Sequence, residues 1–288
     1  MRCSIRGVFI GSEALRSGRL TRGQLRWNYI AIHPDVYIDK AAERTLVVNT
    51  RAAALWVPDG IIAGRAAAAL HGAGFVEDST PIELIGRSRR VRAGVIVREE
   101  RIGADEITRV RDLTVSTPAR TALDMARHLP RGEAIARLDA LAAATGVDVQ
   151  DVLALADRYP GARGIRKARA VVPMLDAGAQ SPRESWLRML VVDGGFPRPV
   201  TQIMVSDGLR TAFVDMGWEE LRIGLEYDGE QHHSDRPQYV KDIARLEMLG
   251  RLDWLVIRVV KEHSRASILR RVHEAFRLRG VADLAKSA

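Results

Sequence analysis

The chain has 288 residues, 47% of them hydrophobic and 28% charged, with a formal net charge of +8 and a pI near 10.1. This composition predicts a globular protein with room for two domains, and its single cysteine, Cys3, excludes an internal disulfide. No apolar run is long enough to span a membrane, the N-terminus lacks a secretion signal, and one cysteine suits a reducing compartment, so a cytoplasmic protein without a membrane partner is expected.

The positive charge suits a polyanionic partner such as DNA, and most of the surplus lies in residues 1–180. Arginine far outnumbers lysine, which is a bias that a GC-rich genome also produces. The charge by itself is therefore weak support for DNA binding.

The first forty residues have the pattern of a small DNA-binding module. Short helices are predicted at 9–15 and 21–27, separated by a tight turn, and short strands at 29–33 and 36–38. Helix, turn, helix and hairpin is the element order of a winged helix-turn-helix. Three arginines at spacings of three and four lie on or near the second helix and share a face, so DNA contacts are predicted for Arg19, Arg22 and Arg26. A helical cap with solvated arginines is the alternative interpretation.

Two segments of this region, ALRSGRLTRGQLRW and HPDVYID, resemble the N-terminal domain of abortive-infection-type antitoxins. The matching stretch is short. The resemblance implies a winged helix-turn-helix that binds DNA and a toxin–antitoxin-like role.

A mixed region of helices and strands follows. Residues 176–180 are predicted to link it to the C-terminal part. The predicted helices are 45–56, 61–71, 117–129, 131–144 and 149–158, and the predicted strands are 81–85, 94–101 and 113–115.

The C-terminal part has a regular order of elements. Ser181-Pro182-Arg183-Glu184 is a capping box that opens a helix through about residue 192. After this helix the sequence predicts three strands at 201–206, 209–215 and 222–228. A helix at 238–249, a strand at 254–260 and a final helix at 264–279 complete the order.

Three acids are predicted to gather on one face of this sheet. Alternation within 222–228 places Glu226 and Asp228 on the same side, and a hairpin brings Asp215 beside Glu226. Like charges this close raise one another's pKa unless a cation lies between them. Carboxylate oxygens favour Mg²⁺ or Mn²⁺, and a nearby imidazole such as His232 can transfer a proton, so the pattern predicts phosphodiester hydrolysis. An exposed strand with solvated acids is the alternative.

The stretch from Asp215 through EYDGEQH resembles the endonuclease-like domains related to very-short-patch-repair nucleases, which belong to the restriction-endonuclease-like PD-(D/E)xK superfamily. The resemblance covers about residues 181–278. It implies that Asp215, Glu226 and His232 are catalytic and that Asp215, Glu226 and Asp228 hold Mg²⁺ or Mn²⁺. The chain departs from the superfamily motif at two positions: Asp228 stands where the motif has lysine, and no proline precedes Asp215. The resemblance to the short-patch-like branch implies that a histidine replaces that lysine.

The resemblance also implies supporting residues around the metal. Glu184 has a structural role in the capping box, and the resemblance adds a second role as an acid directed at the metal site. Asp242 and Arg245 lie one helical turn apart, either as a surface ion pair or near the active cleft with Arg245 meeting a phosphate. The other supporting residues are Gln202 and His233.

The predicted fold is α/β in three parts: a winged helix-turn-helix-like region with following helices at 1–75, a mixed connecting region at 76–178 and a restriction-endonuclease-like domain at 179–280. The predicted function is Mg²⁺-dependent hydrolysis of DNA by an endodeoxyribonuclease with an N-terminal DNA-binding module. One alternative is a non-catalytic DNA-binding regulator or antitoxin-like protein with a degenerate nuclease fold, because a fold alone does not fix a function. Another is a protein-interaction module with no nucleic-acid role.

Overall fold

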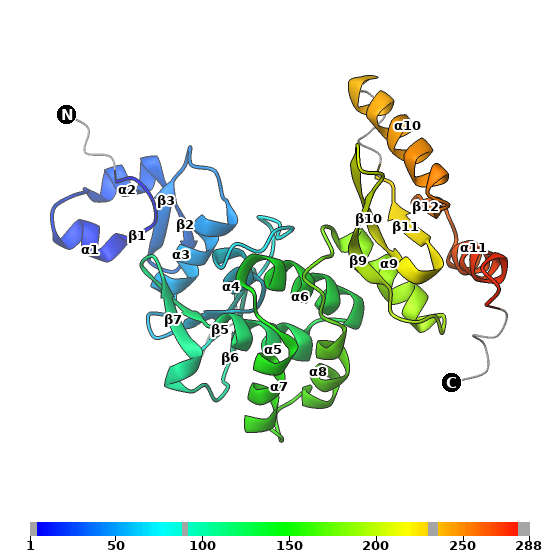
Figure 1. Ribbon diagram of the computed structural model, residues 1–288. Helices are drawn as coiled ribbons and strands as arrows, with labels where there is room; N and C mark the ends of the chain where they lie inside the picture. The colour runs from blue at the N-terminus through cyan, green and yellow to red at the C-terminus, as the bar shows by residue number, and fades with distance from the viewer. Residues whose placement is uncertain (1–4, 88–91, 230–235, 282–288) are drawn as a thin grey trace. The chain divides into compact units, whose positions relative to one another are not determined.

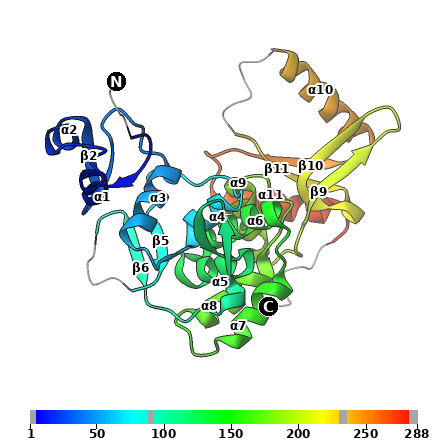
Figure 2. The same cartoon turned by 90° about the vertical axis from the view of Figure 1, so that its left-hand side faces the viewer.

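A computed structural model describes residues 5–87, 92–229 and 236–281, the last range without the side chains of 236–240. The predicted α/β class is confirmed, since the described residues form helices and three sheets (Figure 1; Figure 2). The chain divides into two compact units, Met1–Leu175 (unit 1) and Asp176–Ala288 (unit 2). Within the described ranges, no helix combines the length and the apolar character that crossing a bilayer requires.

The N-terminal module (residues 5–40) contains two short helices and a three-stranded sheet. A capping box begins the second helix: the Thr21 hydroxyl accepts from the Gln24 N–H, and the Gln24 side chain accepts from the Thr21 N–H. The predicted order of helix, turn, helix and hairpin is present, but the first helix was predicted to start two residues too early, because Phe9–Ile10 is a strand that pairs with the strand Val36–Asp39. The elements are β1 (Phe9–Ile10), α1 (Gly11–Arg16), α2 (Arg22–Asn28), β2 (Tyr29–His33) and β3 (Val36–Asp39), with the strands in the order β1-β3-β2.

A five-stranded sheet in the order β6-β5-β4-β8-β7 forms the middle of unit 1. The helix predicted over 61–71 is wrong at its start, because Ile61–Ala63 is a strand that pairs with two others and the helix begins at Gly64. Gly64 has φ +57, and a Cβ there would lie 2.5 Å from the Glu83 carboxyl group, so glycine is required. The elements are α3 (Leu46–Trp56), β4 (Ile61–Ala63), α4 (Gly64–Leu70), β5 (Ile82–Ile85), β6 (Val95–Arg98), β7 (Ile107–Val110) and β8 (Leu113–Ser116).

A group of helices completes the described part of unit 1. The first of them, α5, packs against α4, α6, α7 and α8, and even its charged residues Arg120, Asp124 and Arg127 are buried. The helices are α5 (Pro118–His128), α6 (Arg131–Thr145), α7 (Val149–Arg158) and α8 (Ile165–Val171).

Arg120 lies at the centre of a buried ion-pair network in these helices. Its Nε donates to Asp124 (3.0 Å) and its Nη1 donates to Glu106 (2.7 Å), and the side chains of Arg120 and Glu106 are each 1% exposed. Arg127 donates to both Asp124 (3.0 Å) and Glu100 (2.6 Å). Each buried charge therefore has a partner of opposite sign, which is the condition under which charges persist in a protein interior.

A pH dependence is expected from Glu100, whose carboxylate meets Arg127 and His128. Burial raises the pKa of Glu100, but the hydrogen bonds and charges of His128 and Arg127 lower it from 4.5 to about 2. Because the folded pKa lies below the unfolded one, the stabilisation is complete above pH 4.5 and is lost as the pH falls toward 2.

We therefore expect the gap in unfolding free energy between the wild type and Glu100→Gln to narrow as the pH falls across that window. Urea unfolding of both proteins at a series of pH values measures the gap. A gap that stays constant from neutral to acidic pH would show that Glu100 does not titrate as the ion pairs require.

Unit 2 is a four-stranded sheet with helices on both faces (Figure 1). The strand order is β12-β11-β10-β9, with β11 and β12 parallel and the other neighbours antiparallel. Helices α9 and α11 pack around Leu187, Leu225 and Ile268, whereas α10 packs with Val214 and Met248 in a separate core. The predicted order of elements is present: α9 (Pro182–Asp193), β9 (Val200–Ser206), β10 (Thr211–Trp218), β11 (Ile223–Tyr227), α10 (Arg236–Arg251), β12 (Leu255–Val259) and α11 (Arg265–Leu278).

Strand β10 continues to Trp218, three residues beyond the strand end at 215 that the sequence predicts. Gly217 stands opposite Gly224, and a Cβ on Gly217 would lie 2.1 Å from the Ile223 carbonyl oxygen. Glycine is needed here for the close approach of two backbones, so its presence did not mark a turn. The turn begins later, as a short 3₁₀ segment at Glu219–Leu221.

Candidate functional site

Helix α9 begins at the predicted Ser181 cap, but the reciprocal half of the predicted capping box differs, because Glu184 accepts from groups other than the Ser181 backbone N–H. The Ser181 hydroxyl accepts from the Glu184 N–H (3.1 Å), while the Glu184 carboxylate accepts from the Ser181 hydroxyl and from the Gln180 N–H, both at 2.8 Å. Glu184 is 8% exposed, and its negative charge acts on Asp215. Glu184 therefore has a structural role at the start of the helix and also contributes to the electrostatics of the acidic site.

Strands β10 and β11 separate where the acids lie. Their backbone pairing ends just before Asp215 and Glu226, which the register would otherwise place opposite each other. The Tyr227 N–H donates to the Asp215 carboxylate (2.9 Å). A side chain therefore takes over a hydrogen bond that a strand backbone would make, and the gap between the strands is filled by polar groups.

Arg245, on α10, reaches into this gap. Its guanidinium group makes a bidentate contact with the Glu226 carboxylate, in which Nη1 donates to Oε2 at 3.2 Å and Nη2 donates to Oε1. Nη2 also donates to the Phe213 carbonyl oxygen (2.8 Å). Burial acts to lower the pKa of Arg245, but the hydrogen bond and charge of Glu226, with the charges of Asp215 and Asp242, raise it above its usual value. Arg245 is thus a positive charge that accompanies Asp215 and Glu226.

The acids and arginines line a cavity of about 190 Å³ in unit 2. Asp228, which follows β11, pairs with Arg258 on β12. Sequence reasoning missed Arg258, although a single arginine inside the apolar strand LVIRV was an available signal. The charged residues that line the cavity are Asp215, Glu226, Asp228, Asp242, Arg245 and Arg258.

Asp215 is the least compensated of these acids. Burial raises its pKa from 3.8 to about 6; the Tyr227 N–H opposes the rise, and the charges of Glu184 and Glu226 add to it. A carboxyl group whose charged form is disfavoured by burial and by neighbouring acids is typical of a functional site, where an incoming cation can relieve the repulsion. The arrangement is therefore suited to a hard cation or to proton transfer near neutral pH.

The predicted metal ligands do not form a tight coordination group. Glu226 pairs with Arg245 and Asp228 pairs with Arg258, so two of the three ligand candidates have arginine partners. Among the described residues, one set of acids and histidines has ligand atoms within 4.8 Å of one another, and it lies in unit 1, where Arg120 and Arg127 neutralise it: Glu100, Asp124 and His128.

The remaining predicted site residues are placed as follows. Gln202 lies in β9 at φ +52, and its side-chain oxygen accepts from the Gln180 amide (3.1 Å). Asp242 lines the acidic cavity. His232 and His233 lie outside the described residues, so their roles stay predictions.

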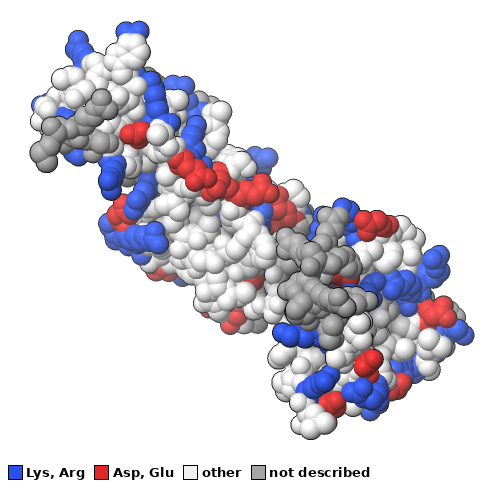
Figure 3. Space-filling model, turned by 90° about the horizontal axis from the view of Figure 1, so that it is seen from above, with Lys and Arg blue, Asp and Glu red and all other residues white. Residues whose placement is uncertain are grey.

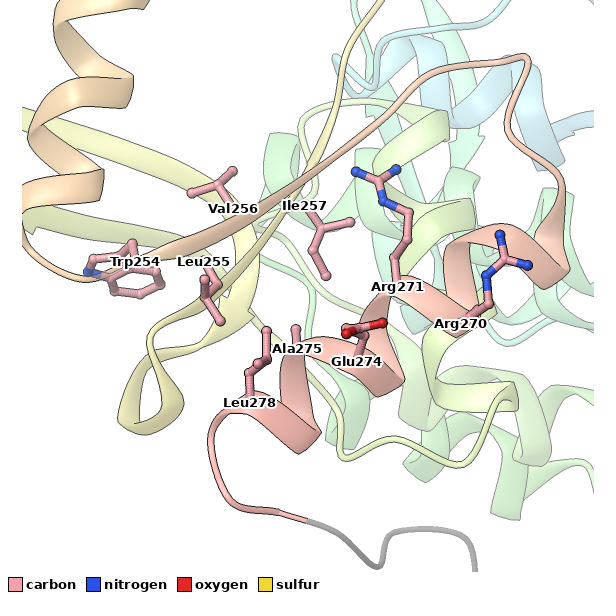
Figure 4. Close-up of a pocket in the computed structure, with 9 residues that line it drawn as sticks. All are labelled: Trp254, Leu255, Val256, Ile257, Arg270, Arg271, Glu274, Ala275 and Leu278. Carbon is pink, nitrogen blue, oxygen red and sulfur yellow. The ribbon is translucent and has the colours of Figure 1, made fainter.

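Another hollow of unit 2, of about 330 Å³, lies between β12 and α11 (Figure 4). Leu255 and Ile257 line one side of it, and Arg270, Arg271 and Glu274 lie along α11 on the other. Its largely apolar wall and single lining acid give it none of the features needed for metal or acid–base chemistry. The acidic cavity is therefore the better candidate for chemistry in unit 2.

In unit 1, the predicted DNA-facing arginines are exposed. Arg22 and Arg26 lie on α2, and Arg19 lies in the turn that precedes it. None of the three guanidinium groups has an ion-pair partner among the described residues, in contrast to the buried arginines of α5. Sequence reasoning missed Trp27 on the same helix, which is 73% exposed.

The comparisons with known proteins give one family match, which lies in unit 1, and two relatives that match over a longer stretch. A family model described as the AbiEi antitoxin C-terminal domain matches residues 60–175. Two proteins of Mycobacterium tuberculosis, the uncharacterized proteins MT2308 (strain CDC 1551 / Oshkosh) and Rv2248 (strain H37Rv), are each 30% identical to this chain over 201 residues, which is 69% of this chain and 73% of the relative.

The antitoxin resemblance is supported by this match, although on residues that follow the segments from which it was inferred. Of the three parts predicted from the sequence, the matched region begins near the end of the first part (1–75) and covers most of the second part (76–178). The chain therefore belongs to the family of these two mycobacterial proteins, and its residues 60–175 match the AbiEi antitoxin C-terminal domain.

Proposed function

We propose that this chain is a DNA-binding regulator of the toxin–antitoxin type. The observation that carries the proposal is the match of residues 60–175 to the AbiEi antitoxin C-terminal domain, in the same compact unit as a module with helix, turn, helix and hairpin. In this role the module contacts DNA through α2, and the exposed arginines neutralise phosphates.

The charge pattern of the module supports a nucleic-acid partner. Two of its three acids, Asp35 and Asp39, are engaged with nearby backbone N–H groups of Ser12 and Ala41, and the third, Glu13, is exposed on α1. The guanidinium groups on and near α2 are left without acidic partners among the described residues. An excess of uncompensated cations on one helix is the electrostatic footprint expected for phosphate contacts.

The test is the double variant Arg22→Ala/Arg26→Ala. It is expected to weaken binding to every DNA sequence and to flatten the dependence of log K on log salt by about one unit for each phosphate that is no longer neutralised, because fewer counterions are released. Fluorescence anisotropy titrations of labelled duplexes over a range of salt concentrations measure both quantities.

The matched control is Arg51→Ala/Arg169→Ala, which removes the same charge from two partly exposed arginines of unit 1 that already pair with Asp112 and Asp157. It is expected to change the salt slope much less. If the double variant of α2 keeps the wild-type slope, the module does not contact phosphate and the proposal fails in this form.

A second candidate function, metal-dependent hydrolysis of DNA phosphodiesters by unit 2, is favoured by the raised pKa of Asp215 beside Glu184 and Glu226. The donors are all carboxylate oxygens, which suits Mg²⁺ or Mn²⁺. Asp215 and Glu226 would hold the ion, provided that Arg245 leaves Glu226. When bound, such an ion polarises the scissile phosphate and lowers the pKa of the attacking water.

The residues of the chain have separate roles in this second candidate. Arg245, released from Glu226, is positioned to pair with a phosphate oxygen. Arg258 pairs with Asp228 and orients its carboxylate at the cavity wall. His232 remains the proposed group for proton transfer, by its position in the sequence after the acidic strand.

A further inference from the structure

Trp27 is exposed in a way that the core of the N-terminal module does not explain. The module already has a core of Phe9, Leu25 and Tyr29, whereas the Trp27 side chain is 73% exposed. Ile30, which follows in β2, is 52% exposed. A tryptophan in water contributes nothing to folding through burial, so this position is better explained by a contact with a partner.

The backbone around Trp27 is held at both ends of α2. The capping box at Thr21 fixes the start of the helix. At the other end the Lys40 ammonium group donates to the carbonyls of Arg26 (3.2 Å) and Trp27 (2.9 Å), and the Lys40 N–H donates to the Asn28 carbonyl (3.0 Å). Trp27 is therefore a large side chain on a fixed backbone, and placing it against a partner loses little conformational entropy.

The surroundings of Trp27 identify the partner as nucleic acid. Every residue of α2 except Leu25 is exposed, and the helix carries Arg22 and Arg26 without a single acid. Figure 3, in which the module lies at the left end, shows basic side chains there with uncharged surface between them. Trp27 and Ile30 expose too little apolar surface for a stable protein interface. The helix that carries Trp27 also carries Arg22 and Arg26, so its surface suits a polyanion with apolar base and sugar edges.

We propose that Trp27 is a specificity-determining DNA contact, whose indole packs against base or sugar edges in a groove of duplex DNA while Arg22 and Arg26 contact phosphates. The inference rests on the proposed DNA-binding function and adds to it a contact that is apolar and therefore insensitive to salt. Phosphate contacts orient a protein on DNA, whereas contacts with base edges distinguish sequences.

The test compares four proteins: the wild type, Trp27→Ala, Trp27→Phe and Phe75→Ala. The last is the matched control, because Phe75 is another exposed aromatic residue of unit 1 (54%), outside the module in the segment between α4 and β5. Each protein is titrated over a range of salt concentrations into two labelled probes, a pool of random-sequence duplexes and the duplexes that the wild type enriches from that pool.

Trp27→Ala is expected to lose about tenfold or more in affinity for the enriched duplexes, to lose less for the random pool, and to keep the wild-type salt slope. Its melting temperature should match the wild type, because the side chain is exposed. Trp27→Phe should retain most of the preference for the enriched duplexes, and Phe75→Ala should bind like the wild type.

The failures are distinguishable. No salt-sensitive binding by the wild type overturns the proposed function itself. Wild-type binding with an unaffected Trp27→Ala variant overturns the Trp27 contact alone. A loss of affinity that comes with a lower melting temperature, or with an equal loss for both probes, also overturns it, since Trp27 would then support the fold or contact DNA without discrimination.

Discussion

Replacing Arg120 with methionine is expected to lower the free energy of unfolding of unit 1 by about 3–5 kcal/mol, because removing one partner of a buried ion pair leaves the other charges buried and uncompensated. Arg120 donates to Asp124, Glu106 and the Arg101 carbonyl within 3.1 Å. Methionine fills similar space but leaves two almost fully buried carboxylates, at 1% and 4% exposure, with fewer donors.

Urea unfolding measures this loss, and thermal melting should fall by roughly 6–20 °C for a unit of this size. The control is Arg169→Met, which removes an arginine from the exposed pair with Asp157 and should change stability by less than about 1 kcal/mol. If Arg120→Met melts within the range of the control, the network does not limit stability, and its acids must be neutralised in another way.

The ion-pair network around Arg120 could be predicted from the sequence only in part, because some of its pairs join residues far apart in the chain. In the helix Pro118–His128 the segment TALDMAR contains an acid and a base among apolar residues, and this is a signal for charges buried on a helix. The partner acids Glu100 and Glu106 come from a preceding segment with no periodic pattern. Ion pairs that join residues 14 to 27 positions apart depend on the tertiary fold, so spacing rules for one helix do not reveal them.

Elements with local signals were predicted well. Thr21, Thr45 and Ser181 each cap a helix through a side-chain hydrogen bond, and each helix begins where the cap indicates. Errors arose where partners far apart in the sequence decide the structure. Ile61–Ala63 has the composition of the alanine-rich helix that follows, but its pairing with β5 and β8 makes it a strand.

The acidic site was predictable only in the part that local sequence patterns determine. Alternation and a hairpin suffice to bring Asp215 toward Glu226, because both rules are local. The arginines that pair with the acids come from α10 and β12, and no spacing rule connects them to β11. The sequence therefore indicates a cluster of acids, whereas the structure shows acids that are partly neutralised, with Asp215 as the exception.

Asp215 provides the sharpest test of whether unit 2 is an enzyme. If it is, Asp215→Asn is expected to lower the rate of Mg²⁺- or Mn²⁺-dependent DNA cleavage by about a hundredfold or more, since the variant loses a charge that holds the ion. The assay follows labelled single- and double-stranded DNA with either metal and with chelator. The control is Glu220→Gln, which removes an exposed acid of the 3₁₀ segment and should cut like the wild type.

The same variant has an expected effect on stability that does not depend on activity. Because the folded pKa of Asp215 is about 6 against 3.8 unfolded, the protein loses stability as the pH rises through this window, and at neutral pH the folded state holds a disfavoured charge. Asp215→Asn removes that charge, so without metal it should melt at or above the wild-type temperature. The wild type should gain stability from millimolar Mg²⁺ or Mn²⁺, and the variant should gain less.

These two measurements separate the candidate functions of unit 2. Cleavage and a metal-induced rise in melting temperature that are both lost in Asp215→Asn would establish the acidic cavity as a metal site with hydrolytic activity. A wild type that neither cuts DNA nor gains stability from metal would rule out that candidate and leave the regulator of unit 1 as the function of the chain. Cleavage that persists in Asp215→Asn would place the active residues elsewhere, because a site that needs the Asp215 charge cannot work with an amide in its position.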